Sequence, residues 1–366
     1  MISYTEVIEL RTDKAAGRAA VKKNSRKKLI IALIIIAVIL ALLAGTAAFA
    51  YHFLIKKFGK MEYTDLSGKD FGIDPGVEKQ LKGYRNILLI GLDTRTGESE
   101  SYSRSDAIII ATINKETGKI TLTSVYRDTM LDIDEDGEHK LDKVTRAYMY
   151  GGPLSLMRTL NRNMDLNIKE YIKVNWQTVA DVTDAMGGLK LNVKDYEIDE
   201  MNKYIKSTNK TLHGNKTKIK KAGWQTLNGI QTVTYCRIRK VGNGDYERSE
   251  RMRRTLKAAF KKAKTMKLSE LNDIANATLP EIGTDISAES MTKMAIKAFD
   301  YKLGKNYGWP YDVTAAIVDG VWYGPPVTLE SNVKELHGKL FKQKDYAPSD
   351  KVQQISNRIK EEIGEN

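Results

Sequence analysis

The stretch Asp106–Tyr126, DAIIIATINKETGKITLTSVY, decides the fold class of this chain. Two runs rich in isoleucine, valine and threonine flank the polar segment Asn114–Gly118, whose glycine favours a turn. The pattern predicts a β-hairpin with strands at 106–113 and 119–126. A shorter apolar run, Asn86–Asp93 (NILLIGLD), precedes the hairpin and is typical of a buried strand.

Helical and strand patterns alternate along the rest of the chain. Helices are expected at 154–164, 178–186, 245–264, 268–277, 288–299, 331–341 and 350–362, and short strands at 171–175, 189–193, 231–239 and 313–318. This alternation predicts an α/β fold with a central mixed β-sheet flanked by helices, in which the hairpin supplies an antiparallel part. The lysine-rich segment 194–222 fits no element and is expected to be a surface excursion.

An uncharged apolar run near the N-terminus, Leu29–Ala50, is 22 residues long. At a rise of about 1.5 Å per residue this run spans the hydrocarbon core of a membrane. A cleaved signal peptide is the alternative, but its apolar region is usually shorter. The basic residues before the run outnumber those after it, which predicts a cytoplasmic N-terminus. We therefore expect a cytoplasmic tail at 1–28, a single transmembrane helix at 29–55, a linker at 56–84 and an extracytoplasmic domain at 85–366.

The formal net charge is +13, and the tail accounts for +5 of it, eight basic residues minus three acidic ones. The remainder of the chain thus carries +8, which favours an anionic partner. On the extracytoplasmic side of a membrane, we expect this partner to be a phosphorylated lipid or an anionic glycopolymer and not a nucleic acid. A tail of 28 residues is also too short for a helix-turn-helix domain, which argues against a membrane-bound regulator of transcription.

Several familiar catalytic motifs are absent from the sequence. It contains no HExxH zinc motif, no GxSxG nucleophile elbow and no GxxxxGK[ST] phosphate loop. The only cysteine, Cys236, excludes an intramolecular disulfide. Its apolar surroundings predict a buried cysteine on a strand and not a nucleophile.

Acidic and arginine side chains instead gather at the ends of the predicted strands. Asp93 and Arg95 follow the first strand, Arg104 and Asp106 open the hairpin, and Arg127 and Asp128 close it. Sites in open α/β sheets form at strand ends, so these groups are expected to converge. The alternative is that each Arg–Asp pair is a solvated surface pair that contributes less than about 1 kcal/mol.

A second set of arginines lies in the segment Tyr235–Arg254, YCRIRKVGNGDYERSERMRR. Arg237 and Arg239 would share a face of a strand, and Arg248 and Arg251 a face of the following helix. Arginine presents a planar fork of donors that matches phosphate oxygens. Two carboxylates near several arginines suit Mg²⁺-assisted phosphoryl transfer, because Mg²⁺ takes one or two carboxylates together with substrate phosphates.

Five motifs in series give a specific resemblance. They are NILLIGLDTR, YSRSDAIIIATINKETGKITLTSVYRDT, KLDKVTRAYMYGG, VADVTDAMGGLKLNV and GWQTLNGIQTVTYCRIRKVGNGDYERSERMR. Together they cover about Asn86 to Lys264, and there the chain resembles the LytR-CpsA-Psr proteins, which are membrane-anchored enzymes of Gram-positive bacteria. The resemblance implies a mixed sheet between helices, with an apolar tunnel for a polyprenyl chain.

The resemblance also implies an activity. Such proteins transfer an anionic glycopolymer (teichoic acid, capsule or another secondary wall polymer) from an undecaprenyl pyrophosphate carrier to peptidoglycan, and water in place of the sugar hydroxyl would give a pyrophosphatase side activity. A non-catalytic polyprenyl-phosphate-binding protein of wall assembly or regulation is the alternative. Asp93 and Asp106 would hold Mg²⁺, or Mn²⁺ in its place, and Asp93 would assist deprotonation of the acceptor hydroxyl.

The resemblance assigns roles to the arginines as well. Those expected to contact the pyrophosphate are Arg104, Arg127, Arg237, Arg239, Arg248 and Arg251. Arg95 and Asp128 match an acid-x-arginine and an arginine-aspartate motif of the family and join the catalytic candidates. The chain departs from the pattern at Met252, where the family usually has glutamine, and methionine cannot donate a hydrogen bond to phosphate.

Overall fold

The structure, a computed structural model, describes residues 49–93, 103–135, 138–212 and 217–364. It divides into two compact units, residues 1–56 and 57–366. Within the described ranges, no helix is both long and apolar enough to cross a membrane. The predicted tail and residues 29–48 of the predicted span lie outside those ranges.

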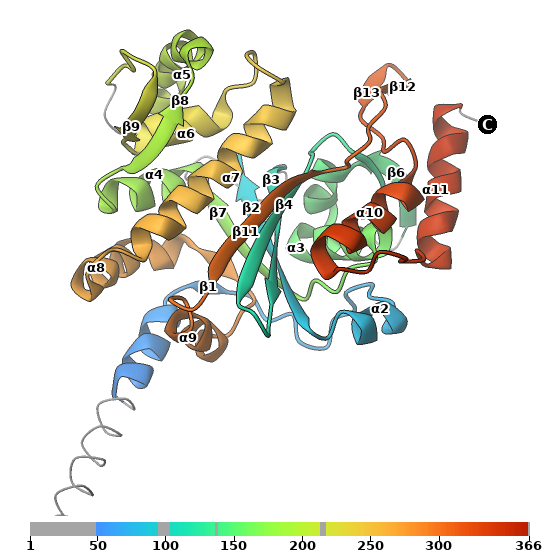
Figure 1. The fold of residues 1–366 in the computed structure, drawn as a ribbon, viewed down its shortest axis with the longest axis horizontal. Coiled ribbons are helices and arrows are strands. Elements are labelled where there is room, and N and C mark those ends of the chain that lie inside the picture. The colour runs from blue at the N-terminus through green and yellow to red at the C-terminus, as the bar shows by residue number, and fades with distance from the viewer. Residues whose placement is uncertain (1–48, 94–102, 136–137, 213–216, 365–366) are drawn as a thin grey trace, which may run out of the picture. The chain divides into compact units, whose positions relative to one another are not determined.

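A seven-stranded mixed sheet forms the centre of the second unit (Figure 1). Its strand order is β1 (Glu62–Tyr63), β10 (Gly283–Thr284), β7 (Glu170–Asn175), β2 (Tyr84–Leu92), β3 (Ser105–Asn114), β4 (Lys119–Val125) and β11 (Lys302–Trp309). Strands β2, β3 and β4 are antiparallel neighbours, whereas β2 pairs in parallel with β7 and β4 with β11. The predicted α/β class, mixed sheet and hairpin are thus confirmed.

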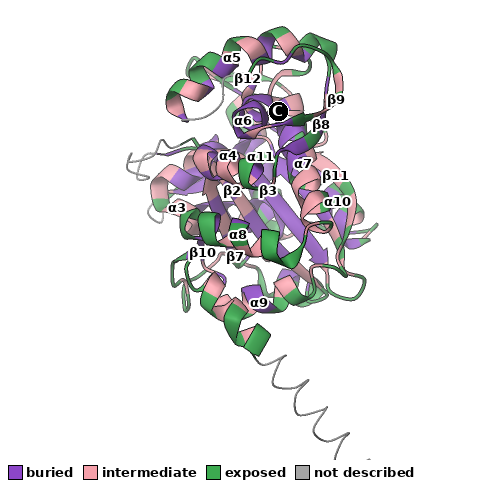
Figure 2. Ribbon diagram, turned by 90° about the vertical axis from the view of Figure 1, so that its left-hand side faces the viewer, coloured by how far each residue is buried: buried purple, intermediate pink, exposed green. Residues whose placement is uncertain are grey.

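Helices cover both faces of the sheet. The core on one face contains residues of α2 (Pro75–Gln80), α3 (Val144–Met164), α10 (Leu329–Phe341) and α11 (Asp350–Ile363). The core on the other face contains residues of α4 (Trp176–Ala185), α5 (Ile198–Thr211), α6 (Gly229–Arg237) and α7 (Gly244–Ala263). Side chains alternate between the two faces of a strand. Accordingly, Ile108 and Ile110 of β3 join the first core, and Ile109 joins the second. Figure 2 shows the buried strands between these layers.

The remaining elements lie around this frame. Helices α8 (Leu268–Thr278) and α9 (Ala288–Ile296) follow α7. Hairpins are formed by β5 (Met130–Glu135) with β6 (Glu138–Lys143), by β8 (Leu189–Val193) with β9 (Gly223–Leu227), and by β12 (Ala316–Val318) with β13 (Val321–Tyr323). The sequence predictions missed β5, β6, β9, β10, β11 and β13.

The predicted strand at 231–239 is wrong, because this segment forms helix α6. Its first turn carries a capping box: the Asn228 side chain accepts a hydrogen bond from the Gln231 N–H at 2.9 Å, and the Gln231 side chain accepts one from the Asn228 N–H at 3.0 Å. This reciprocal pair satisfies two donors that a helix start leaves free. The isoleucine, valine and threonine residues of the segment favoured a strand, and the cap and the packing of α6 override that preference. Cys236 is buried as predicted, but on this helix.

Two segments expected to lack structure are folded. The surface excursion 194–222 contains a 3₁₀ turn at Asp195–Glu197 and helix α5, whose Met201 and Ile205 are buried. The linker 56–84 contains β1 and α2, and Val77 and Leu81 belong to the main core. In α5 the residues Ile198, Met201 and Ile205 recur at helical spacing, a signal that the lysine-rich composition of the segment concealed. Helix α2 spans only six residues and is too short to show such a period.

Candidate functional site

Asp106 lies at the centre of the candidate site, at the start of β3. The register between β2 and β3 shifts at this point: Gly91 pairs with Ala107 and Leu92 with Ser105, so Asp106 has no opposite residue. Such a bulge redirects a side chain and is common beside functional sites. The Asp106 side chain is only 8% exposed.

Three arginines from separate elements meet on the Asp106 carboxylate. Arg127, just after β4, donates to Oδ1. Arg248 of α7 donates to Oδ2 at 2.8 Å, and Arg239, from the loop before α7, donates to the same oxygen at 3.4 Å. Arg248 also binds Asp245 at 3.0 Å, one turn earlier on α7. We call Asp106, Arg127, Arg239, Arg248 and Asp245 the arginine cluster.

The arginines of the cluster differ in exposure. Arg248 is 2% exposed, and although burial lowers its pKa, Asp106 and Asp245 outweigh that effect and raise it. Arg239 is 41% exposed, and its pKa is lowered by burial and by the positive charges of Arg248 and Arg127. Arg239 therefore faces solvent in a positive field, which an anionic ligand would relieve.

Two further charges border the cluster. Asp128 lies 3.6 Å from Arg127 and 3.1 Å from the ammonium group of Lys143. The cluster and this pair together hold four cations (Arg127, Lys143, Arg239, Arg248) and three carboxylates (Asp106, Asp128, Asp245). These groups carry a net charge of +1, and the guanidinium of Arg239 is accessible to solvent. Both properties suit a ligand that bears phosphate.

The other predicted site residues take different positions. Asp93, at the end of β2, is exposed and accepts a hydrogen bond from the Trp176 indole at 3.0 Å. Arg104 is exposed directly before β3. Arg95 lies outside the described residues.

Arg237 and Arg251 do not join the cluster. Because 231–237 is helical, Arg237 does not share a strand face with Arg239, and it donates to Thr208 of α5 at 3.3 Å. Arg251 is 0% exposed, and it donates to Glu197 at 2.7 Å and to the Ile238 carbonyl at 2.8 Å. The structure thus separates the predicted pairs and keeps one member of each, Arg239 and Arg248, beside Asp106.

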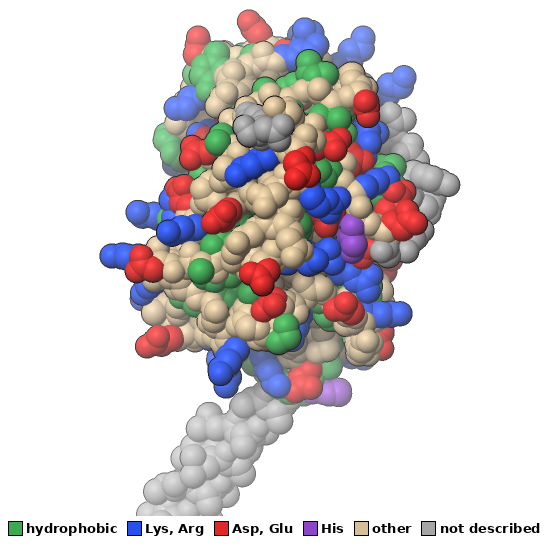
Figure 3. Space-filling view, turned by 90° about the vertical axis from the view of Figure 1, so that its right-hand side faces the viewer, with side chains coloured by type: hydrophobic (Ala, Val, Ile, Leu, Met, Phe, Trp, Pro, Cys, Tyr) green, Lys and Arg blue, Asp and Glu red, His purple; other side chains and the backbone are tan. Residues whose placement is uncertain are grey.

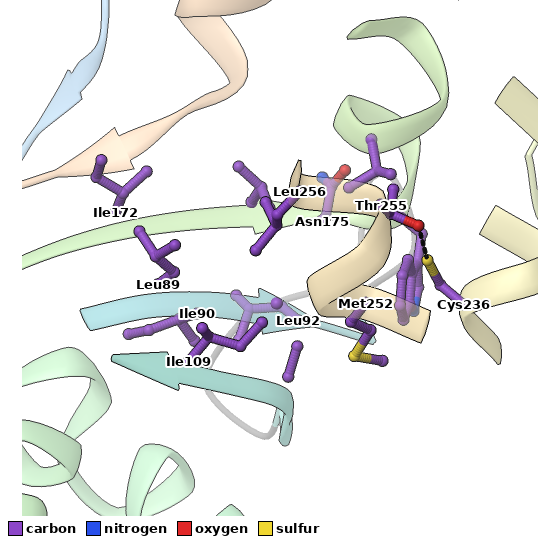
Figure 4. A pocket seen from close by; sticks show the side chains of 15 residues that line it. Leu89, Ile90, Leu92, Ile109, Ile172, Asn175, Cys236, Met252, Thr255 and Leu256 are labelled. Atoms are coloured by element: carbon purple, nitrogen blue, oxygen red, sulfur yellow. Dashed lines mark hydrogen bonds between the residues drawn. The ribbon is translucent and has the colours of Figure 1, made fainter. Parts of the chain in front are cut away.

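An apolar cavity of about 160 Å³ opens beside the cluster, between the sheet and helices α4, α6 and α7 (Figure 4). Its lining includes Leu92 and Ala107, the neighbours of Asp93 and Asp106 in the chain. Met252, one turn after Arg248, also lines it, together with Cys236, whose pKa burial raises to about 11. A cavity of this volume with so apolar a lining accepts a small apolar group. Met252 therefore faces an apolar space and not the phosphate-binding surface that its family position implied.

Two carboxylates are available for a divalent cation. No group of three or more potential ligands occurs among the described residues, but Mg²⁺ is commonly held by one or two carboxylates and completes its shell with water and phosphate. Among the described residues, Asp106 Oδ1 accepts from Arg127 alone and keeps a lone pair, and Asp93 is exposed. Asp93 and Asp106 thus fit such an ion in the chemistry of their donors.

Three residues of the site were missed or given no role by sequence reasoning. Lys143 and Trp176 contact Asp128 and Asp93 but belong to motifs without an obvious charge pattern. Asp245 lies within the segment Tyr235–Arg254 and was given no role, yet its contact with Arg248 follows directly from their spacing of three on a helix. That spacing was the available signal.

Comparison with known proteins places this site in context. A model of the LytR_cpsA_psr family matches residues 49–326. A protein of Enterococcus faecalis named polyisoprenyl-teichoic acid–peptidoglycan teichoic acid transferase TagU is 30% identical over 243 residues, which are 65% of this chain and 73% of that protein. The protein of the same name in Bacillus subtilis is 26% identical over 331 residues, 88% of this chain and 99% of that protein.

Solved structures share the fold. The crystal structure of Bacillus subtilis TagT has a TM-score of 0.54 at 21% identity and covers 83% of this chain and 100% of that one. TagT bound to LIIa-WTA gives a TM-score of 0.56 at 21% identity over 82% of this chain and 100% of that one. TagT with bound octaprenyl pyrophosphate lipid gives 0.50 at 20% identity over 83% and 97%.

Proposed function

This chain belongs to the LytR-CpsA-Psr family, and on that premise we propose that it transfers an anionic glycopolymer from a polyprenyl pyrophosphate carrier, such as undecaprenyl pyrophosphate, to peptidoglycan. One observation carries the proposal: the arginine cluster lies beside an apolar cavity, whose lining residues Leu92 and Ala107 adjoin Asp93 and Asp106 in the chain. A ligand with a charged head and an isoprenoid chain matches both parts. The relatives named as teichoic acid transferases and the lipid-bound TagT structure support this reading.

The cavity limits how the lipid binds. At about 160 Å³ it holds a group of roughly benzene size, comparable to one isoprene unit. A longer chain would therefore extend out of the cavity. Leu256 of α7 lines the cavity and is partly exposed, so this helix marks the direction in which the chain would leave.

The reaction that fits is transfer of a phosphoryl-linked polymer. An acceptor hydroxyl attacks the phosphorus that carries the polymer, the bond to the second phosphate breaks, and polyprenyl phosphate leaves. Arg127, Arg239 and Arg248 stabilise the charge that develops on the phosphate oxygens, while Asp106 and Asp245 hold these side chains in place. Asp93 is exposed and available to accept the proton of the hydroxyl. Mg²⁺ held by Asp93 and Asp106 would supply further charge neutralisation.

Membrane attachment is part of the same proposal. A lipid-linked donor stays in the bilayer, so the enzyme has to work at its surface. The apolar run Leu29–Ala50 would anchor the chain as a single pass, with the domain on the extracytoplasmic side. Teichoic acid is the polymer in the names of the relatives, and we take it as the first donor to test.

Arg239→Ala in the full-length protein tests the proposal. Its side chain is the most exposed of the cluster, so its loss should leave the fold intact while it removes one phosphate donor. We expect transfer from lipid-linked donor to peptidoglycan to fall by about 10²–10³-fold, the usual cost of one such donor. Arg254→Ala is the matched control, since Arg254 pairs with Glu250 on the same helix, away from Asp106. Full transfer by Arg239→Ala would overturn the proposal.

Chelation of divalent cations distinguishes the two candidate functions, a Mg²⁺-dependent transferase and a non-catalytic lipid-binding protein. With EDTA we expect loss of polymer transfer while binding of the polyprenyl chain is retained. If the wild-type protein binds the lipid-linked donor but transfers no polymer with or without Mg²⁺, the chain is a binder and the assignment as a transferase fails.

A further inference from the structure

The hairpin β8–β9 presents an outward face with an unusual composition. Leu189, Leu191 and Val193 point into the core, so Lys190 and Asn192 face outward. Opposite them in the ladder stand Thr226 and Trp224, and Trp224 is 68% exposed. An exposed indole ring offers a flat apolar face together with an N–H donor, and this combination suits contact with a ligand that is partly apolar and partly polar.

Lysines extend this face on both sides. Lys194 follows β8, and Lys218, Lys220 and Lys221 precede β9; all four are exposed, as is Lys190. None of the five makes an ion pair with a carboxylate in the described part of the chain. In sequence, residues 190–224 contain nine lysines and four acids, an excess of five. Two of those acids, Glu197 and Glu200, are buried, so the outer surface is more basic than this count. We call Lys190, Lys194, Lys218, Lys220, Lys221 and Trp224 the basic ribbon.

The basic ribbon is joined to the arginine cluster through short contacts. The Tyr196 hydroxyl, two residues after Lys194, donates to Glu247 of α7 at 2.6 Å. Glu247 directly precedes Arg248, and it also accepts a hydrogen bond from the Asn243 N–H in the loop that carries Arg239. Glu247 comes so near Gly242 in this loop that a Cβ there would clash with its carboxylate. The loop, the 3₁₀ turn and the ribbon therefore form one connected surface.

From this juxtaposition we propose that the basic ribbon binds the anionic glycopolymer part of the donor, several repeats away from the pyrophosphate. The inference rests on the proposed function and extends it to a second subsite on the same substrate. A polymer with one phosphate per repeat presents evenly spaced negative charges, and five unpaired lysines meet them without the loss of any existing ion pair. Trp224 stacks on a sugar or polyol between phosphates.

An anionic membrane is the competing occupant, because lysine and tryptophan also bind lipid surfaces. The position of the ribbon favours the polymer. In Figures 1 and 2, α5, β8 and β9 lie at one end of the domain, whereas β1 and α9 lie at the other. Residues 57–61 lead into β1, so this domain begins at the end that carries β1 and α9. The ribbon thus lies at the end of the domain opposite to the one where the domain begins.

The rest of the surface provides a contrast. The face that carries α10 and α11 shows acidic and basic side chains interspersed, with no broad patch of one sign (Figure 3). Exposed lysines alone therefore do not distinguish the ribbon from the rest of the surface. The ribbon differs because its lysines form no ion pair among the described residues and lie beside an exposed indole.

The test compares two triple variants of the full-length protein in nanodiscs. The ribbon variant is Lys190→Gln, Lys220→Gln and Lys221→Gln; the control, Lys297→Gln, Lys302→Gln and Lys305→Gln, removes the same charge from an exposed region around α9 and β11. The probe is lipid-free oligo(glycerol phosphate), with binding measured by calorimetry at several salt concentrations. One lysine near an anionic surface is worth roughly fivefold in affinity, so we expect the ribbon variant to bind at least about tenfold more weakly and with a smaller salt dependence. The control should bind like wild type.

Equal losses in both variants would mean that net charge alone attracts the polymer, and this would overturn the proposal. So would a ribbon variant that binds the oligomer normally, or one whose only defect is weaker binding to phosphatidylglycerol vesicles. With lipid-linked donors of increasing length, the ribbon variant should show a KM that rises with polymer length. Absence of transfer by the wild-type protein would count against the proposed enzyme activity and leave the oligomer measurement to decide the ribbon.

Discussion

Arg251 shows how far the environment of one residue can depart from its sequence context. Its position among other arginines predicted a contact with pyrophosphate, yet its side chain is wholly buried against Glu197, also 0% exposed. A buried charge needs its partner, because removal of one side leaves the other uncompensated.

Arg251→Met should therefore lower the free energy of unfolding by roughly 3–5 kcal/mol. The double variant Arg251→Met with Glu197→Leu should regain most of this loss, since no lone charge is left in the core. Urea unfolding followed by circular dichroism measures both. If Arg251→Met keeps wild-type stability, the ion pair has no structural role and the phosphate assignment gains ground.

Asp285 is a second residue whose surroundings decide its behaviour. It accepts a hydrogen bond from the Tyr171 N–H at 2.8 Å, and burial raises its pKa from 3.8 to about 6 in spite of such backbone bonds. The folded protein thus holds this proton more tightly than the unfolded chain. Asp285 contributes its full stability below about pH 4, and this contribution is lost as the pH rises through 6.

Asp285→Asn keeps the hydrogen-bond acceptor and removes the titration. We expect the variant to have a higher melting temperature than wild type at pH 7.5, with the difference shrinking toward pH 4. Asp300→Asn, at an exposed position, is the control and should melt like wild type at each pH. A constant difference between Asp285→Asn and wild type across this range would contradict the assignment.

At the scale of elements, helix α6 depends on its cap. The segment has few strong helix formers, and its first turn is held by the reciprocal hydrogen bonds of Asn228 and Gln231. The helix in turn ends next to the loop that carries Arg239. The helix propensity of this segment is weak. Its helical conformation is therefore stabilised by the capping box and by burial of its side chains.

Asn228→Ala should cost about 1 kcal/mol of unfolding free energy, within the usual range of a lost cap. The chain offers a matched control in Asn243, which occupies the cap position of α7 without a side-chain hydrogen bond to the helix. Asn243→Ala should cost clearly less in the same chemical unfolding experiment. Equal costs for the two variants would show that the capping box does not stabilise α6.

The strands and helices differ in how well the sequence predicts them. Strands β2, β3 and β4 carry long runs of isoleucine, leucine and valine, and α7 has a clear apolar stripe, so all four were predicted within two residues of their bounds. Strand β11 (KLGKNYGW) contains two glycines, two lysines and no β-branched residue, and it was missed. It is held by its pairing with β4, which no local pattern reveals.

At the scale of the whole molecule, the cluster and the cavity together predict a ligand effect. A prenyl pyrophosphate should occupy both, whereas inorganic pyrophosphate reaches only the arginines. Ligand that binds only the folded state at 100 times its Kd adds about 2.7 kcal/mol to stability. We therefore expect geranyl pyrophosphate to raise the melting temperature more than inorganic pyrophosphate at equal concentration.

A cavity-filling variant sharpens this test. Ile109 lines the cavity from β3, so Ile109→Phe should remove the extra response to the prenyl chain and keep the response to inorganic pyrophosphate. Thermal unfolding with each ligand measures the two effects. Identical shifts of the wild-type protein with both ligands would show that the cavity does not take the chain.

Local patterns and an ordered series of motifs were enough to predict the strands of the hairpin, the basic helix α7, the candidate acids and arginines, and the resemblance to a family. Which arginines meet at Asp106 depends instead on how distant segments pack together. Arg248 and Asp106 are 142 positions apart, and their contact depends on a bulge in β3 and on the packing of α7. The same packing turned Arg251 inward and Met252 toward the cavity. On one helix, positions a few residues apart face different surroundings, and those surroundings exist only once the distant segments have packed together.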